Sequence, residues 1–205
     1  MSDSHHLTAT LWEYIMPMER GDRYEDPLDE ALSQHDLGGV SGGGSQLSDD
    51  CGIEFVDIEI TLNDLERGIP VIVATLEANG APKGSRLRHD QGADRQTLEF
   101  GVTECLAVFL DGVGLPDEVY QTNDINVLIE QLAEILSGDG LGELRSWWQG
   151  PKETALFYFG EDAERMFQAM RPPLENFPLS QNARMVIRHG KPELNPRIVR
   201  LGSST

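Results

Sequence analysis

Residues 11–15 read LWEYI, and residues 106–110 read LAVFL, at an offset of 95 residues. Two further pairs of segments match in the same order: 37–40 (LGGV) with 141–144 (LGEL), offset 104, and 87–89 (LRH) with 187–189 (IRH), offset 100. Offsets that vary this little are typical of a duplicated unit with loop insertions and deletions. The sequence therefore predicts two related units.

Within each unit, the apolar pattern and the turn residues predict the order strand-helix-strand-strand-helix-strand. The expected first-unit elements are a strand (11–16), a polar loop (18–25), a helix capped by Asp26, a strand with glycines in a loop or frayed edge beside it (42–44), a strand around 56–62, a helix from about Gly68 and a strand (85–89). The second unit repeats the order: a strand (105–110), a helix capped by Asp124, a hairpin (144–148 and 154–159), a helix (162–170) ended by Pro172 and Pro173, and a strand (184–188).

This element order predicts an α+β fold, in which a ferredoxin-like β-α-β-β-α-β unit with an antiparallel sheet occurs twice in tandem. We expect the first unit at 8–90, a linker with room for an extra strand at 91–102, the second unit at 103–192 and a C-terminal arm at 193–205.

The chain of 205 residues is strongly acidic, with 35 acidic and 16 basic side chains and a net charge of −19. A field of this sign repels phosphate, which argues against nucleic-acid and anionic-membrane partners. Residues 171–205 have six basic and two acidic side chains, net +4, which leaves −23 on residues 1–170. The basic arm is therefore expected to dock on the acidic body.

Cys51 and Cys105 do not make a disulfide framework in a chain of this length, and both are expected to remain thiols. The first ten residues lack a signal-peptide pattern, and no apolar run is long enough to span a bilayer. A cytoplasmic protein is the resulting prediction.

The glycine-rich segment has two functional interpretations. Residues 39–43 match G-x-S-x-G, but a nucleophile elbow needs a strand before the serine and a helix after it, and the order expected here is the reverse. Gly42, Gly43, Gly44 and Ser45 could instead form a loop that presents N–H groups to a ligand such as a phosphate, although neither phosphate-binding glycine pattern is present. An irregular sheet edge is the structural alternative.

The side chains that could bind a metal or a substrate are not organised into a motif. His89 and His189 end the matching LRH and IRH segments, yet no zinc-type spacing surrounds them, which favours a structural role. Glu13, Asp57 and Glu59 could bind a cation or act as acid and base, or form a solvated acidic surface. We predict no catalytic residue, no metal site and no cofactor.

Trp147 and Trp148 are adjacent on an expected strand, so one ring should enter the core and the other should stay on the opposite face as a contact for a partner or for the other repeat. Two function classes remain open. The first is a non-enzymatic interaction protein, for example an inhibitor or immunity-type protein, that binds a basic protein partner through Glu13, Asp57, Glu59 and a tryptophan anchor. The second is a small-molecule-binding protein or enzyme with a pocket between the repeats.

Overall fold

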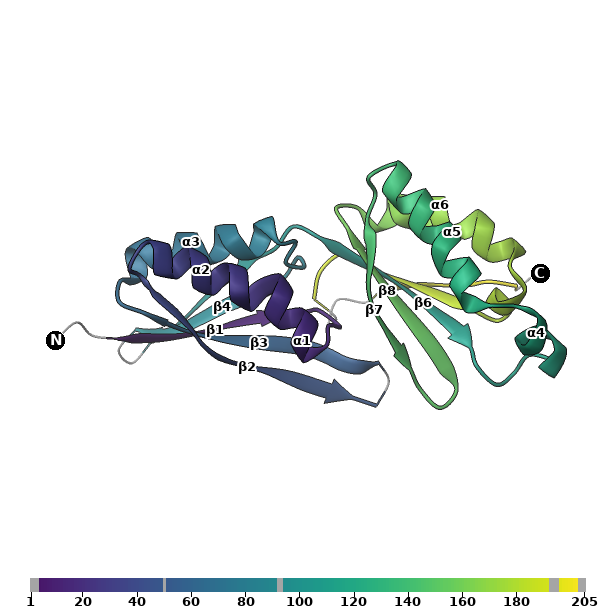
Figure 1. Cartoon of the computed structure of the whole chain (residues 1–205), viewed down its shortest axis with the longest axis horizontal. Helices are drawn as coiled ribbons and strands as arrows, with labels where there is room; N and C mark the ends of the chain where they lie inside the picture. The colour runs from purple at the N-terminus through teal and green to yellow at the C-terminus, as the bar shows by residue number, and fades with distance from the viewer. Residues whose placement is uncertain (1–3, 50, 92–93, 192–195, 203–205) are drawn as a thin grey trace. The chain divides into compact units, whose positions relative to one another are not determined.

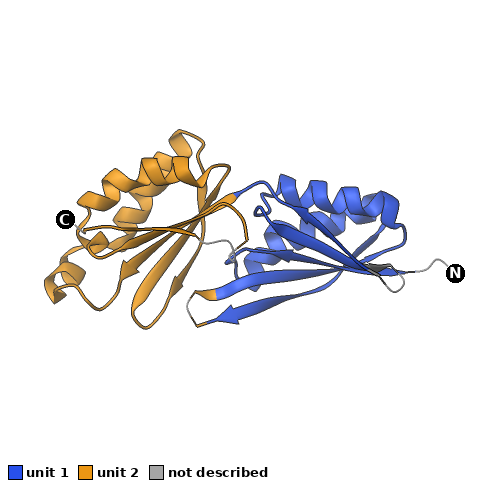
Figure 2. Ribbon diagram, turned by 180° about the vertical axis from the view of Figure 1, so that it is seen from behind, with its two compact units in different colours: residues 1–48, 53–103 blue, residues 49–52, 104–205 orange. Residues whose placement is uncertain are grey.

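The computed structural model describes residues 4–49, 51–91, 94–191 and 196–202 (Figure 1). The chain divides into two compact units (Figure 2). The first comprises Met1–Ser48 and Ile53–Thr103, and the second comprises Asp49–Gly52 and Glu104–Thr205. The expected boundary at 192/193 lies outside the described residues.

The first unit contains a five-stranded sheet in the order β2-β3-β1-β4-β5. Its elements are β1 (His5–Leu11), α1 (Pro17–Arg20), the π-helix η1 (Gly21–Glu25), α2 (Asp26–Gln34), β2 (Gly38–Ser48), β3 (Gly52–Leu62), α3 (Leu65–Ala78), β4 (Ser85–Gln91) and β5 (Asp94–Phe100). The strand β1 pairs antiparallel with β3 and β4, and β5 pairs antiparallel with β4.

The second unit repeats this topology in the order β10-β9-β6-β8-β7. Its elements are β6 (Glu104–Asp111), α4 (Asp117–Thr122), α5 (Ile125–Gly138), β7 (Glu143–Gln149), β8 (Glu153–Gly160), α6 (Ala163–Asn176), the 3₁₀-helix η2 (Pro178–Ser180), β9 (Arg184–Arg188) and β10 (Arg197–Arg200). In both units the helices cover one face of the sheet (Figure 1). The protein is thus an α+β tandem duplication of a ferredoxin-like unit, as the sequence predicts.

Each unit also has a fifth strand, next to its fourth. In the first unit this is β5, inside the segment 91–102, and in the second it is β10, inside the basic arm. Arg197–Arg200 pairs with Arg184–Ile187, so part of the arm extends the second sheet.

Each core lies between the sheet and its helices. In the first unit, alternate residues of β1 and β3 pack with one stripe from each helix; the buried side chains include Leu7, Ala9, Leu11, Val56, Ile58, Ile60, Leu28, Leu32, Ile72 and Leu76. In the second unit the corresponding side chains include Leu106, Val108, Leu110, Leu156, Tyr158, Leu128, Leu132, Phe167 and Met170. Alternation on the strands and a spacing of three or four on the helices are the patterns that bury one face of each element.

Several expected boundaries are wrong. The strand β1 ends at Leu11, where an apolar run continues into a buried segment without strand structure. The helix α3 begins at Leu65, because Asp64 accepts the Arg67 N–H as its cap, and Pro70 lies inside it. The helix α6 continues through Pro172 and Pro173 to Asn176, and the buried Leu174 packs its last turns on the core.

The register of the strands also corrects the first repeat match. His5 lies opposite Leu62, two residues before the cap Asp64, and Glu104 lies opposite Gly160, two residues before the cap Asp162. The strand β1 therefore corresponds to β6 at an offset of 99, not 95. At this offset Leu7 corresponds to Leu106. Leu7 pairs with His89, and Leu106 pairs with Ile187, so the position equivalent to His89 is Ile187 and not His189.

Candidate functional site

One continuous helical run extends from Pro17 to Gln34 through α1, η1 and α2, and we call it the acidic helix. The Asp26 N–H donates to the Gly21 carbonyl, five residues back, which is the mark of a wider π turn. In an α-helix the ring of Pro27 would crowd the carbonyl four residues before it. The wider turn just before Pro27 gives the ring room, so the polar loop and helix start expected here are wrong.

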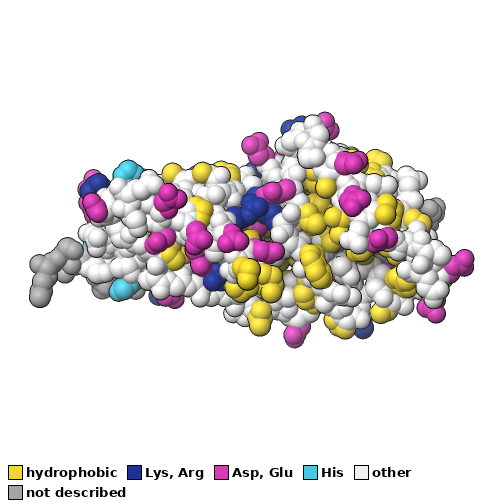
Figure 3. Space-filling view, in the orientation of Figure 1, with side chains coloured by type: hydrophobic (Ala, Val, Ile, Leu, Met, Phe, Trp, Pro, Cys, Tyr) yellow, Lys and Arg dark blue, Asp and Glu magenta, His cyan; other side chains and the backbone are white. Residues whose placement is uncertain are grey.

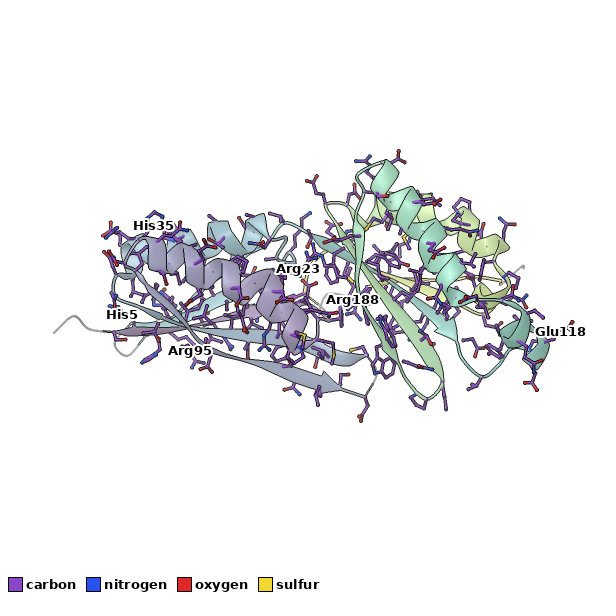
Figure 4. All side chains as sticks on the ribbon, in the orientation of Figure 1. His5, Arg23, His35, Arg95, Glu118 and Arg188 are labelled. Carbon is purple, nitrogen blue, oxygen red and sulfur yellow. The ribbon has the colours of Figure 1, made fainter. Side chains whose placement is uncertain are left out.

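The two sides of the acidic helix have opposite character. Its buried side carries Arg20, Tyr24, Leu28 and Leu32, spaced four residues apart. Its solvent side carries five exposed carboxylates: Glu19, Asp22, Asp26, Asp29 and Glu30. Figure 3 shows acidic side chains gathered over α1 and α2, with hydrophobic side chains beside them. This surface was not predicted from the sequence, although the acids at positions 19, 22, 26 and 29 recur every three or four residues, as on one helical face.

Arg20 anchors the acidic helix to the edge strand β2. Its Nε donates to Glu25 Oε1 at 2.6 Å, and its Nη1 donates to the Gly44 carbonyl at 2.8 Å and to Ser45 Oγ at 3.2 Å. The guanidinium is buried, so these bonds satisfy donors that would otherwise be costly to bury. The exposed acids therefore stand on a helix that is fixed to the sheet.

The glycines at 42–44 are part of β2, an eleven-residue strand, and do not form the expected loop. A Cβ on Gly43 would lie 2.5 Å from Glu25 Oε1 and 2.8 Å from Arg20 Nη2, closer than side chains pack. Glycine is thus required where the anchor of the acidic helix approaches the strand. Of the predicted ligand-loop atoms, the Gly44 carbonyl and the Ser45 hydroxyl are both bonded to Arg20.

Glu13 does not belong to an exposed surface, which corrects its expected placement. Its side chain is fully buried, and its Oε2 accepts the Tyr24 hydroxyl at 2.6 Å. Tyr24 lies on the buried side of the acidic helix, so the two residues form a buried polar contact beneath the exposed acids.

Three large apolar side chains are exposed at or near the start of the acidic helix. Met18 is 81% exposed, Leu47 is 71% exposed and Met16 is 57% exposed. Met16 is the N-cap of the acidic helix, and Met18 lies in its first turn. Leu47 lies on β2, two residues after Ser45, and the Ser45 hydroxyl accepts a hydrogen bond from Arg20 of that first turn. Such exposure of flexible methionine side chains beside charged groups is typical of protein-binding surfaces.

Asp57 and Glu59 lie on the face of the first sheet that the helices leave open, but this face is not purely acidic. Asp57 accepts the Thr10 hydroxyl at 2.5 Å and lies 3.9 Å from the Arg88 guanidinium. Glu59 is exposed, opposite Thr8. Arginines of β4 therefore offset part of the acidic charge.

Trp147 and Trp148 lie on β7, in the second unit. Trp147 is 62% exposed and sits opposite Leu156, while Trp148 is half-buried opposite Ala155. Adjacent strand positions point to opposite faces. The more exposed ring is the one on the helix-covered side, at the edge of the sheet.

Two open hollows of about 480 and 580 Å³ flank Asp111 at one end of the second sheet. The Asp111 carboxylate accepts the Val113 and Gly114 N–H groups at 3.0 and 2.7 Å, and these bonds lower its pKa. Its other oxygen accepts the Asn182 amide at 3.2 Å. A carboxylate held in its anionic form by backbone N–H groups is a loop cap rather than a proton-transfer group.

The remaining predicted candidates do not assemble into a reactive site. His189 Nδ1 lies 2.9 Å from Glu104 Oε2, which also accepts the Ala163 N–H at the start of α6. Within the described part of the chain, no three His, Cys, Asp or Glu side chains are placed to hold a metal ion. Cys51 and Cys105 are thiols rather than a disulfide. Over the same residues, every helix is too short or too polar to cross a membrane.

No family model matches the chain, and no curated protein sequence matches it. Solved structures match it at low similarity. An unknown protein from Galdieria sulphuraria is 11% identical, with a TM-score of 0.28 over 91% of this chain and 98% of that chain. The regulatory subunit of aspartate kinase from Thermus thermophilus is 10% identical, with a TM-score of 0.26 over 82% of this chain and 93% of that one. A proposed monooxygenase from Fusobacterium nucleatum is 10% identical, with a TM-score of 0.31 over 98% of this chain and 96% of that chain. Similarity at this level gives no ground for transferring an activity.

Proposed function

We propose that the protein is a non-enzymatic binding protein and that the acidic helix of its first unit takes a basic protein partner. The observation that carries this proposal is the row of five exposed carboxylates on a helix that Arg20 fixes to the sheet. The surrounding charge has the same sign, because residues 1–103 contain 20 acidic and seven basic side chains, net −13. Such a field steers a cationic surface and raises its association rate.

Exposed charge pairs contribute little affinity each, about 0–1 kcal/mol, so stable binding also needs an apolar anchor. Met18, with Met16 and Leu47 nearby, supplies apolar area at the start of the same helix. A partner that presents Lys or Arg beside a few large apolar side chains, such as a basic amphipathic helix, fits both parts of this surface. The proposed setting is the cytoplasm, on the ground that a chain with two cysteines needs no oxidising compartment.

The experiment uses a labelled amphipathic helical peptide of lysines and leucines as a model basic partner. The double variant Asp22→Lys/Asp26→Lys reverses two charges on the acidic helix, and Glu130→Lys/Glu134→Lys makes the same change on exposed positions of α5. Stopped-flow fluorescence at low salt should show association slowed by about tenfold or more for the first variant and little changed for the second. Met18→Ser should speed dissociation.

Equal slowing by both double variants would mean that the peptide responds to net charge alone, which would overturn the choice of surface. Failure of the wild-type protein to bind, together with a metabolite that raises the melting temperature, would favour the alternative proposal of a small-molecule-binding protein.

A further inference from the structure

The four edge strands of the two sheets differ in how open they are to pairing with another strand. At the edges of the first sheet lie β2 and β5, and at those of the second lie β7 and β10. A register shift between Leu144 and Ser146 interrupts the regularity of β7. Glycines occupy five of the first seven positions of β2, which leaves its pairing register weakly specified. The strand β5 has neither feature.

The strand β5 is seven residues long, without glycine or proline, and pairs with β4 over its whole length. The five successive residues from Arg95 to Glu99 are all exposed. A regular edge strand of this kind presents a row of main-chain N–H and C=O groups that a further strand can meet.

We propose that β5 is a homodimer interface, at which it pairs antiparallel with β5 of a second copy of the chain around a twofold axis through Thr97. In this register Arg95 lies opposite Glu99 of the second copy, and Glu99 lies opposite Arg95 of the second copy. Gln96 faces Leu98 of the second copy, and Thr97 faces its own counterpart. The sequence of β5 is thus self-complementary in charge, as an isologous twofold interface requires.

The exposure of two β5 side chains is compatible with this pairing. Glu99 lies 3.5 Å from the Arg86 guanidinium, and its side chain is 59% exposed, which leaves it accessible to a second cation. Leu98, 45% exposed, would lose solvent contact in the dimer. Main-chain hydrogen bonds would supply most of the affinity, and the charge pairs would fix the register.

The topologically equivalent strand β10 provides a contrast. It is only four residues long, and a twofold axis through Ile198 or Val199 would place an arginine opposite an apolar residue of the second copy, not opposite a carboxylate. The strand therefore lacks the charge complementarity of β5. Arg197 also makes two bonds to Glu164, at 2.6 and 2.7 Å. The inference therefore concerns the edge of the first sheet, and it is independent of the proposed binding by the acidic helix.

Sedimentation velocity over a range of protein concentrations tests the proposal with charge variants. Arg95→Glu and Glu99→Arg each place like charges opposite each other twice per dimer, and each should weaken dimerisation by on the order of tenfold or more. An equimolar mixture of the two variants restores both opposite-charge pairs and should recover a heterodimer. Arg165→Glu, a matched change at an exposed position of α6, should leave dimerisation unchanged. Melting curves verify that each variant is folded.

A cross-link gives a second readout. In the proposed register Thr97→Cys places two thiols opposite each other, within the Cα separation of about 4.4–6.8 Å that a disulfide spans. Mild oxidation should therefore give a covalent dimer linked through position 97, whereas Ile198→Cys on β10 should remain uncross-linked. A wild-type protein that is monomeric at all concentrations, a dimer insensitive to Arg95→Glu, or cross-linking at position 198 instead of 97 would each overturn the proposal.

Discussion

Two fully buried tyrosines differ in how their hydroxyl groups are bonded. The Tyr24 hydroxyl donates to Glu13 at 2.6 Å in the first unit. The Tyr158 hydroxyl lies in the core of the second unit and finds no hydrogen-bond partner among the described residues. A buried polar group without a partner loses its hydration and gains nothing in return. The two hydroxyls should therefore contribute to stability with opposite signs.

Tyr24→Phe should lower the free energy of unfolding by about 1–3 kcal/mol, because it removes a buried bond to a carboxylate. Tyr158→Phe should raise it by on the order of 1 kcal/mol, since it removes an unsatisfied hydroxyl and leaves the ring packing intact. Urea unfolding at pH 7 measures both changes. A loss of stability in Tyr158→Phe would show that its hydroxyl is in fact satisfied.

Tyr158 also affects stability in alkaline solution. Burial raises the pKa of Tyr158, so the folded protein holds this proton more tightly than the unfolded chain. The protonated hydroxyl therefore contributes its full share to the free energy of unfolding below the unfolded pKa of about 10. This contribution decreases as the pH rises above that value. Tyr158→Phe should accordingly lessen the loss of stability above that pH, relative to the wild type.

At the scale of elements, the acidic helix and the glycine-rich strand β2 depend on each other. Gly43 has no room for a Cβ between Glu25, Arg20 and the Asp57 carbonyl, whereas a Cβ on Gly44 would meet no atom within 4 Å. Close packing therefore explains why residue 43 is glycine, whereas no contact explains the glycine at position 44.

Gly43→Ala should destabilise the protein by about 1–3 kcal/mol, because the methyl group displaces the anchor of the acidic helix. Gly44→Ala should be neutral or stabilising by up to about 0.5–1 kcal/mol, as expected when alanine replaces glycine inside a strand. Equal effects of the two substitutions, measured by thermal and urea unfolding, would contradict the close approach of Arg20 and Glu25 to β2.

The sequence predicts some of these elements well and others poorly, for physical reasons. Strands such as β3 and β8, and the cap Asp124, depend on local patterns that a single segment contains. Pro27 and the glycines of β2 have low helix and strand propensity, and the elements form there because a π turn and a closely packed neighbour compensate. The row of exposed acids was not predicted, because residues 18–25 were expected to form a loop rather than a helix. The burial of Glu13 depends on Tyr24, which no pattern within one element could reveal.

At the scale of the whole molecule, the charge is distributed unevenly between the units. Residues 1–103 have a net charge of −13, and residues 104–205 have a net charge of −6, from 15 acidic and nine basic side chains. Repulsion among so many carboxylates opposes folding of each unit, most strongly of the first.

The melting temperature should therefore rise when NaCl is increased from about 0.01 M to about 0.1 M, a change that shortens the Debye length from about 30 Å to about 10 Å. Asp22→Lys/Asp26→Lys, which has less repulsion to screen, should show a smaller rise. Differential scanning calorimetry measures both. A melting temperature that falls with added NaCl would mean that attractive ion pairs outweigh repulsion.

The fifth strand of each sheet has a consequence for the ancestry of the chain. Both β5 and β10 flank the fourth strand of their unit and run antiparallel to it. Duplication of a unit that already contained the fifth strand explains this arrangement more simply than two independent additions at the same position. The ancestral gene segment therefore encoded five strands, and the copied stretch continued past β4 and β9. A related sequence that contains a single unit should extend through this fifth strand, and one that ends at the fourth would argue for later, separate additions.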